Sequence, residues 1–290
     1  MRAVKTLGAL LALFLFASVG EAASTPAEWL NPISPFHIVG NLYYVGSEDL
    51  ASYLIVTSEG NILINSSTES SVPLIKASVA KLKFKYSDTK ILLISHAHGD
   101  HDAGSAAIIK DTGAKYMVMD GDVPVVESGG RADFAYPESL YPKAPVDRVL
   151  HDGDDVRLGE AVLIAHKTAG HTQGCTTWTL DAKSAGGVKH VVIVGGWYVN
   201  PGFRLVDKPG KPASYPGIAA DYRRTFEVLK GLSCDVFLGA HGSYFSMLKK
   251  LERAKVEGDA VWVDPEGYVT TLNAREADFD AELKQQQGAN

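Results

Sequence analysis

Short apolar runs separated by turns occupy the first third of the chain, a pattern that is typical of β-strands. The runs at residues 42–45, 53–56 and 62–64 are separated by turns that contain Gly, Ser and Glu, and we expect an antiparallel meander there. A helix is expected at residues 71–84, where apolar residues recur on one face. Residues 91–94 are apolar at every position, which predicts a strand that is buried on both faces.

Helices and strands alternate over the rest of the chain. Glycine, proline and aromatic residues at 128–145 and 200–216 indicate two long surface loops. The expected helices are 102–110, 122–127, 218–232, 243–256 and 274–287. The expected strands are 116–119, 162–165, 176–180, 191–194 and 236–238, with short strands at Val149 and Val156. No repeat or linker-like composition divides the chain, so we expect one domain of two sheets and outer helices.

Composition and charge narrow the class of protein. The 290 residues are 46% hydrophobic and 21% charged, which is typical of a globular chain with a large core. The formal net charge is −6, and charges of one sign form no long run, so nucleic acid is not an expected partner. Cys175 and Cys234 lack the close spacing of a zinc-finger or redox motif. A disulfide between them and a free buried thiol both stay open.

The N-terminal segment has the features of a secretory signal peptide. Two basic residues precede an apolar stretch at residues 7–19, and small residues precede an expected cleavage point after Ala22. The apolar stretch is shorter than the roughly 18 residues that a membrane span needs. We therefore expect a signal peptide at 1–22 and a single mature domain at 23–290. The mature protein is expected to be periplasmic or secreted and free of the membrane.

The densest polar cluster follows the strand that is expected to be buried. It reads H-A-H-G-D-H at residues 96–101, and imidazole and carboxylate groups are ligands that zinc accepts. Two histidines at positions i and i+2 of an extended backbone point to the same side, so His96 and His98 can bind one ion. Asp100 and His101 follow the glycine and are expected to face a neighbouring position.

Two more histidines directly follow expected strands. His171 comes after the strand at 162–165, and His241 comes after the strand at 236–238. Loops at strand ends are where sheets present functional side chains, and the glycine beside each histidine lets the backbone approach an ion. The remaining four histidines lack this combination, and we interpret them as surface or core residues: His37, His151, His166 and His190.

The H-A-H-G-D-H motif, the G-H-T of residues 170–172 and the G-A-H-G of residues 239–242 resemble motifs of the metallo-β-lactamase superfamily. The resemblance covers residues 36–250. It is strongest to class B β-lactamases of the third subclass, because of T-A-G-H-T-Q-G-C-T-T-W at 168–178 and N-P-G-F at 200–203. It implies an αββα sandwich, an α/β fold in which two mixed β-sheets are flanked by helices.

The resemblance also implies two zinc ions per chain. Their ligands would be His96, His98 and His171 for the first ion, and Asp100, His101 and His241 for the second. Two cations lower the pKa of a shared water, and the resulting hydroxide would open the amide bond of a β-lactam antibiotic. Asp100 is the expected catalytic residue, because it would orient this hydroxide. The expected partner is a small β-lactam molecule, and the expected enzyme is a monomer.

One position departs from the family pattern. The first subclass has a Cys ligand after a Gly-Gly pair on the strand that follows the third histidine, and the lactonase and glyoxalase II relatives have an Asp there. Trp197 follows Gly195 and Gly196 in this chain, and an indole does not bind zinc. Trp197 either contacts substrate near the second ion or fills space between the sheets. The candidate substrate contacts are Phe134, Trp197 and Asn200.

Three functions are compatible with these residues. The first is a secreted dizinc hydrolase that opens β-lactams. The second is another hydrolase of the same fold that acts on a lactone or a thioester, which Trp197 disfavours. The third is a periplasmic zinc-binding protein without catalysis, which the complete set of six ligands disfavours.

Overall fold

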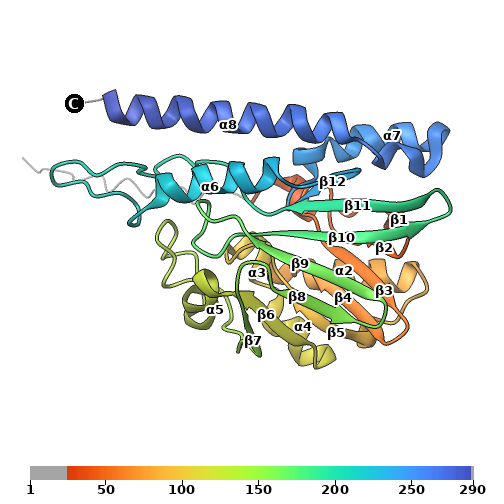
Figure 1. Cartoon of the computed structure of the whole chain (residues 1–290). Coiled ribbons are helices and arrows are strands. Elements are labelled where there is room, and N and C mark those ends of the chain that lie inside the picture. Colours follow the sequence, from red (N-terminus) through yellow and green to blue (C-terminus); the bar gives the residue numbers. More distant parts are fainter. Residues whose placement is uncertain (1–24, 289–290) are drawn as a thin grey trace, which may run out of the picture.

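The computed structural model describes residues 25–288, so the expected signal peptide at 1–22 lies outside the described residues. Two β-sheets pack face to face between two layers of helices (Figure 1). This arrangement is the αββα sandwich that the sequence predicts, and the fold prediction is confirmed. None of the helices in the described part of the chain is both long enough and apolar enough to cross a membrane.

The first sheet has seven strands in chain order. They are β1 (Phe36–Val39), β2 (Leu42–Tyr44), β3 (Tyr53–Thr57), β4 (Gly60–Ile64), β5 (Thr89–Leu93), β6 (Lys115–Met119) and β7 (Arg148–Leu150). The first four pair antiparallel, which confirms the expected meander, and the pairs from β4 to β7 are parallel. Because parallel strands run in one direction, the carboxyl ends of β4, β5 and β6 lie at the same edge.

The second sheet has five strands in the order β12-β11-β10-β9-β8. They are β8 (Asp155–Leu158), β9 (Ala161–Lys167), β10 (Thr176–Ser184), β11 (Gly187–Val194) and β12 (Val236–Gly239). The pair β11 and β12 is parallel, and the other pairs are antiparallel. The strands β9, β11 and β12 therefore run in the same direction and end at a common edge.

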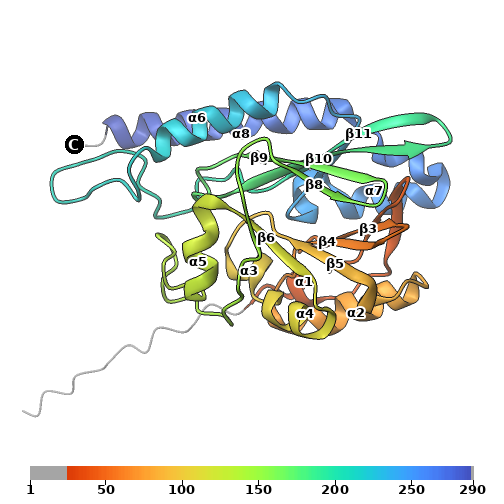
Figure 2. The same ribbon diagram turned by 60° about the horizontal axis from the view of Figure 1, so that its bottom comes forward.

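Helices cover the outer face of each sheet. α2 and α4 lie over the first sheet, and α6 and α8 lie over the second (Figures 1 and 2). The helices are α1 (Ala27–Leu30), α2 (Val72–Lys81), α3 (Gly99–Asp102), α4 (Ser105–Thr112), α5 (Val123–Ser128), α6 (Ile218–Lys230), α7 (Met247–Glu257) and α8 (Pro265–Gly288). α8 buries Tyr268, Leu272, Phe279 and Leu283, whose spacing is that of one face of a helix.

Strand β5 lies in the middle of the core, as its sequence predicts. Leu93 belongs to the apolar cluster that the two sheets share, whereas Leu92 belongs to the cluster between the first sheet and its helices. Both side chains are fully buried, so β5 is covered on both faces. An uninterrupted apolar run is the sequence that such a strand requires.

Two hydrogen bonds join the sheets where β5 ends. The backbone N–H of Thr176 donates to the carbonyl oxygen of Ser95 at 2.7 Å. The indole N–H of Trp178 donates to the carbonyl oxygen of Ile94 at 3.0 Å. These bonds place the start of β10 beside the residues that lead from β5 into the H-A-H-G-D-H loop.

Several short elements differ from the sequence-based expectation. The helix expected at 102–110 is found as α4, with the one-turn helix α3 before it and Gly104, which packs against Ser66, between the two. A Cβ atom at Gly104 would lie only 2.6 Å from the Ser66 carbonyl oxygen. Strand β1 and helix α1 were not predicted, since elements of four residues show too little of a period to be identified.

Candidate metal centre

The structure brings all six sequence-predicted ligands to one edge of the sandwich. His96 and His98 lie on the loop after β5, and Asp100 and His101 lie on α3. His171 is on the loop between β9 and β10, and His241 follows β12. All six side chains lie on loops or on a short helix that follow the carboxyl end of a strand, because both sheets present the carboxyl ends of these strands at this edge.

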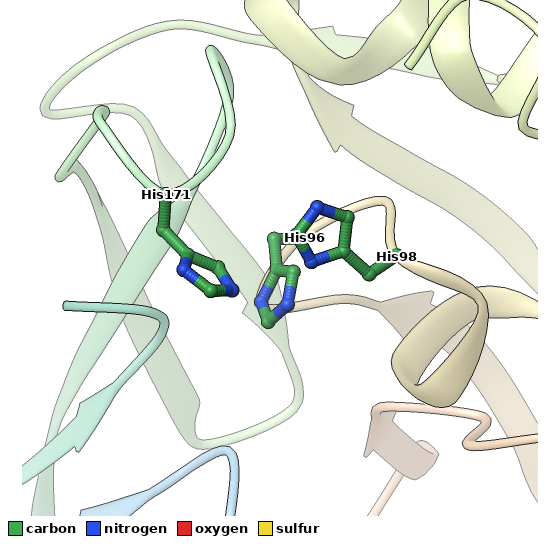
Figure 3. Close-up of side chains that lie close together, drawn as sticks. All are labelled: His96, His98 and His171. Atoms are coloured by element: carbon green, nitrogen blue, oxygen red, sulfur yellow. The ribbon is translucent and has the colours of Figure 1, made fainter. Parts of the chain in front are cut away.

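His96, His98 and His171 form one group, which we call the first triad. One ring nitrogen from each lies within 4.8 Å of the others. Figure 3 shows the three rings turned toward a common point, with His171 opposite the other two. All three side chains are buried, so the sheets and loops hold their rings in place.

Asp100, His101 and His241 form a second group, which we call the second triad. His101 Nε2 lies 3.2 Å from Asp100 Oδ2 and 3.1 Å from His241 Nε2. His241 Nε2 lies 3.5 Å from Asp100 Oδ2. Ligand atoms around a tetrahedral zinc ion with bonds of about 2.05 Å are roughly 3.3 Å apart. The separations and donor types of the second triad therefore fit one zinc ion.

Three neighbouring groups lie beside the outer nitrogens of the candidate ligand rings, and two of them form hydrogen bonds. The Nδ1 of His171 lies 2.9 Å from the carbonyl oxygen of Tyr198, and the Nδ1 of His241 lies 2.8 Å from Asp49 Oδ2. Each Nδ1 is therefore the donor, which leaves Nε2 as the free metal-binding nitrogen. The Nε2 of His98 lies 3.3 Å from Asp133 Oδ2 without forming a hydrogen bond.

Asp49 and Asp133 contact candidate ligands and could not be identified from the sequence. Asp49 is 192 positions from His241 in sequence, and Asp133 lies in the loop at 128–145. Neither belongs to a metal-binding motif, and no periodic pattern connects either one to its histidine. Only the folded arrangement places these carboxylates beside the outer nitrogens of the rings.

The two triads differ in charge in the metal-free protein. Burial, followed by the neighbouring imidazoles, holds the pKa of His96 and His98 well below the usual value. Burial lowers the pKa of His171 to about 4. The first triad is therefore neutral at pH 7 and presents free lone pairs to a metal ion.

The second triad carries both a carboxylate and a proton. Burial raises the pKa of Asp100, but interactions with His101 and His241 outweigh burial and hold it well below its usual range. Burial lowers the pKa of His241, but hydrogen bonds with Asp100 and Asp49 outweigh burial and raise it to about 9. A metal ion that binds here must displace the proton of His241.

A cavity of about 550 Å³ opens over both triads. Its volume lies in the range of pockets that bind small molecules. Trp29 from α1 and Tyr244 lie on the side of His241, and Tyr136 and Tyr141 come from the loop at 128–145. The remaining lining residues are His98, Gly99, Asp100, Asp133, Ser139, His171, Tyr198, Asn200, His241 and Ser243.

The three candidate substrate contacts have different positions. Asn200 lines the cavity and donates a hydrogen bond to the hydroxyl of Tyr136 at 3.0 Å. Phe134 does not line the cavity and packs its ring against Phe203 and Tyr215. Of the three, Asn200 is therefore the one with a side chain at the site.

Trp197 lies in the core rather than at the cavity. Its side chain is 1% exposed and contacts the rings of Phe237 and Tyr244. The residue that faces the ligands is Gly196, because a Cβ atom there would overlap with the ring of His171. The position that faces the candidate ligands is therefore Gly196, one residue earlier than the comparison with the family motif placed it.

The other histidines and both cysteines lie apart from the two triads. His37 pairs with Asp259, and His190 pairs with Asp181. The remaining two histidines, His151 and His166, belong to neither triad. Both cysteines are free thiols, so the structure contains no disulfide between Cys175 and Cys234.

An αββα sandwich with two groups of metal ligands at one edge defines a metalloprotein. The metallo-beta-lactamase superfamily model matches residues 50–241, which is most of the described chain. The chain therefore belongs to the metallo-beta-lactamase superfamily, and the resemblance seen in the sequence is confirmed.

Solved structures of this superfamily superimpose over nearly the whole chain. The native FEZ-1 metallo-beta-lactamase from Legionella gormanii is 52% identical, with a TM-score of 0.86 over 89% of this chain and 98% of that one. The class B3 di-zinc metallo-beta-lactamase LRA-12 from an Alaskan soil metagenome is 37% identical, with a TM-score of 0.81 over 91% and 99%. A probable metallo-hydrolase from Burkholderia pseudomallei is 29% identical over 94 residues, about a third of each chain.

The position of Trp197 leads to a stability prediction. Trp197→Ala removes a buried indole and leaves a cavity, so the free energy of unfolding is expected to fall by about 3 to 5 kcal/mol. Zinc affinity at the second triad is expected to be unchanged, because the indole does not line the site. Urea denaturation and zinc titration of the same variant measure the two quantities. Weaker zinc binding in a variant of wild-type stability would contradict the core position.

The charges of the two triads predict different pH dependences of metal binding. Zinc must displace a proton from His241 below about pH 9, so affinity at the second triad is expected to rise by up to about tenfold per pH unit between about pH 7 and 9. Affinity at the first triad is expected to stay nearly constant there, because its histidines are already neutral. Competition titrations with a chelator at a series of pH values measure both.

A variant of Asp49 tests whether the raised pKa of His241 causes this pH dependence. Asp49→Asn removes a negative charge that raises the pKa of His241, so the pH-dependent range at the second triad is expected to move to lower pH. The first triad is expected to behave as in the wild type. Equal pH dependence of both ions in the wild type would show that His241 does not hold the proton.

Proposed function

We propose that this protein is a dizinc hydrolase that opens the amide bond of β-lactam antibiotics. The observation that carries the proposal is the convergence of two complete ligand triads beneath one open cavity. Relatives that match most of the chain are named metallo-beta-lactamases, and LRA-12 is named a di-zinc enzyme. We assign one zinc ion to each triad.

The chain supplies the ligands, the orientation and the shape of the site. When bound by these residues, zinc would lower the pKa of a water molecule and polarise a carbonyl group. Asp100 directs Oδ2 at His101 and His241, and its Oδ1 would accept a hydrogen bond from the attacking water. This hydrogen bond would orient the lone pair of the water toward the amide carbon.

The cavity residues account for binding of a bicyclic amide. Trp29, Tyr136 and Tyr198 offer ring surfaces that a flat or apolar substituent can contact. Asn200 and Ser243 offer hydrogen-bonding groups that suit the carboxylate of a β-lactam. The site thus combines apolar walls with a few polar groups, as small-molecule sites commonly do.

The proposed place of action follows from the first residues of the chain. We infer that residues 1–22 are removed as a signal peptide and that the mature domain at 23–290 acts in the periplasm or outside the cell as a monomer. The charge of −6 and the small-molecule cavity support a small β-lactam partner rather than nucleic acid or a membrane.

Turnover with and without metal tests the proposed activity. The purified protein is expected to hydrolyse a chromogenic cephalosporin, to lose this activity in a strong chelator and to regain it on addition of zinc. Metal analysis of the active protein is expected to give two zinc ions per chain. His171→Ala is expected to lose mainly the first ion, and His241→Ala mainly the second.

Three outcomes would overturn parts of this proposal. Hydrolysis of acyl-homoserine lactones or glutathione thioesters without β-lactam turnover would replace the substrate class. Two bound zinc ions without any hydrolysis would favour a non-catalytic zinc-binding protein. Active protein that contains a single ion would contradict the dinuclear site.

Asp100 provides a sharper test of the mechanism. Asp100→Asn keeps the shape of the side chain but removes the negative charge, so kcat is expected to fall by on the order of a hundredfold. The assay is run at saturating zinc, and metal content is measured on the same sample, so that loss of metal does not explain the result. An unchanged kcat at full zinc occupancy would exclude a role for Asp100 in catalysis.

A further inference from the structure

A buried carboxylate lies between the two loops that carry the first triad. Asp122 closes the turn Asp120–Asp122 after β6, and its side chain is 1% exposed. Its Oδ2 accepts hydrogen bonds from the backbone N–H of Ala97 at 2.9 Å and from the hydroxyl of Thr172 at 2.8 Å. Its Oδ1 accepts a hydrogen bond from the backbone N–H of Gly174 at 2.8 Å.

The donors to Asp122 are next to the metal ligands in sequence. Ala97 lies between His96 and His98, and Thr172 directly follows His171. One carboxylate therefore holds both loops of the first triad, although it belongs to a third element and binds no metal itself. Its hydrogen bonds fix the separation across which the three imidazole nitrogens must meet.

Two glycines allow the turn that carries Asp122 to approach the loop after His171 closely. A Cβ atom on Gly174 would lie 2.7 Å from the Cβ atom of Asp122, and a Cβ atom on Gly121 would overlap with the carbonyl oxygen of Gln173. The turn that carries Asp122 and the loop after His171 therefore interlock only because both positions lack a side chain. This fit is independent of the hydrogen bonds and supports the same contact.

Because Asp122 is buried, the loss of any of its hydrogen bonds is costly. A buried carboxylate is costly unless donors surround it, and Asp122 has three. Removal of one acceptor oxygen leaves a buried N–H without a partner, which the loops can avoid only by moving. Ligand geometry tolerates little movement, since a productive site needs its groups within about 0.5 Å of their places.

We propose that Asp122 is a positioning residue that sets the zinc affinity of the first triad. It acts by holding the His96 and His98 loop at a fixed distance from the His171 loop. The inference rests on the proposed zinc-binding role of the first triad. Asp122 itself is not one of the six candidate ligands and belongs to none of their sequence motifs.

Asp122→Asn tests this inference through zinc affinity. The amide has one acceptor oxygen instead of two, so either Ala97 or Gly174 loses its partner. Zinc affinity at the first triad is expected to fall by about 10- to 100-fold, the range found when groups that orient metal ligands are changed. Affinity at the second triad is expected to stay within about twofold. Competition titration with a chelator resolves the two ions.

Matched variants separate this role from a general loss of structure. Asp120→Asn alters a part-exposed carboxylate of the same turn that pairs with Lys167, and its zinc affinity is expected to match the wild type. Thr172→Val removes one hydrogen bond without removing Asp122, and a smaller loss of about three- to tenfold is expected. Thr172→Ser keeps the hydroxyl and is expected to restore wild-type affinity.

A measurement on zinc-free protein gives a second readout. Hydrogen exchange of the Ala97 and Gly174 amides is expected to be faster in Asp122→Asn than in the wild type, and unchanged in Asp120→Asn. If Asp122→Asn does not fold, Thr172→Val and Thr172→Ser still decide the question through zinc affinity. Wild-type affinity in Asp122→Asn, or in Thr172→Val when Asp122→Asn does not fold, would overturn the inference. An equal loss at both triads would also overturn it. A wild type that binds no zinc would instead overturn the proposed function.

Discussion

The site depends on the junction between the two sheets at the carboxyl end of β5. There Thr176 and Trp178 of the second sheet donate hydrogen bonds to Ser95 and Ile94 of the first. Parallel pairing within each sheet gathers strand ends at an edge, and this junction puts the two edges together. Loops far apart in sequence therefore leave the sandwich at the same place, and the ligands that they carry converge.

Convergence alone does not make a metal site, because buried imidazoles can rotate and can take up protons. Neighbouring groups affect both properties. The Tyr198 carbonyl and the Asp49 carboxylate hydrogen-bond to the outer nitrogens of His171 and His241, and Asp133 lies beside His98. Burial keeps the first triad neutral, whereas Asp100 and Asp49 retain a proton on His241. The two triads therefore offer a metal ion different chemistry.

The two sheets with outer helices, and the histidines and aspartate that the structure brings to one edge, could be predicted from the sequence, because local patterns and a family resemblance carry both. The apolar run of β5 and the H-A-H-G-D-H motif are contiguous, and the glycine turns at His171 and His241 each follow a strand. Asp49, Asp122 and Asp133 could not be found in this way, since their partners lie elsewhere in the chain. The residue that faces the candidate ligands is Gly196 and not Trp197, because a Gly-Gly-Trp run does not indicate which of its residues points toward the site.

The candidate ligands and the rest of the cavity lining come from largely different segments. The candidate ligands lie on short connections that follow strands of both sheets, whereas much of the remaining lining comes from α1, the loop at 128–145, the residues after β11 and the residues after His241. The loop at 128–145 contacts the metal-binding loop through the hydroxyl of Tyr141, which donates to the Ala97 carbonyl at 2.6 Å. Changes at Trp29, Tyr136 or Asn200 are therefore expected to alter what the cavity accepts, because these side chains line it and none hydrogen-bonds to a candidate ligand.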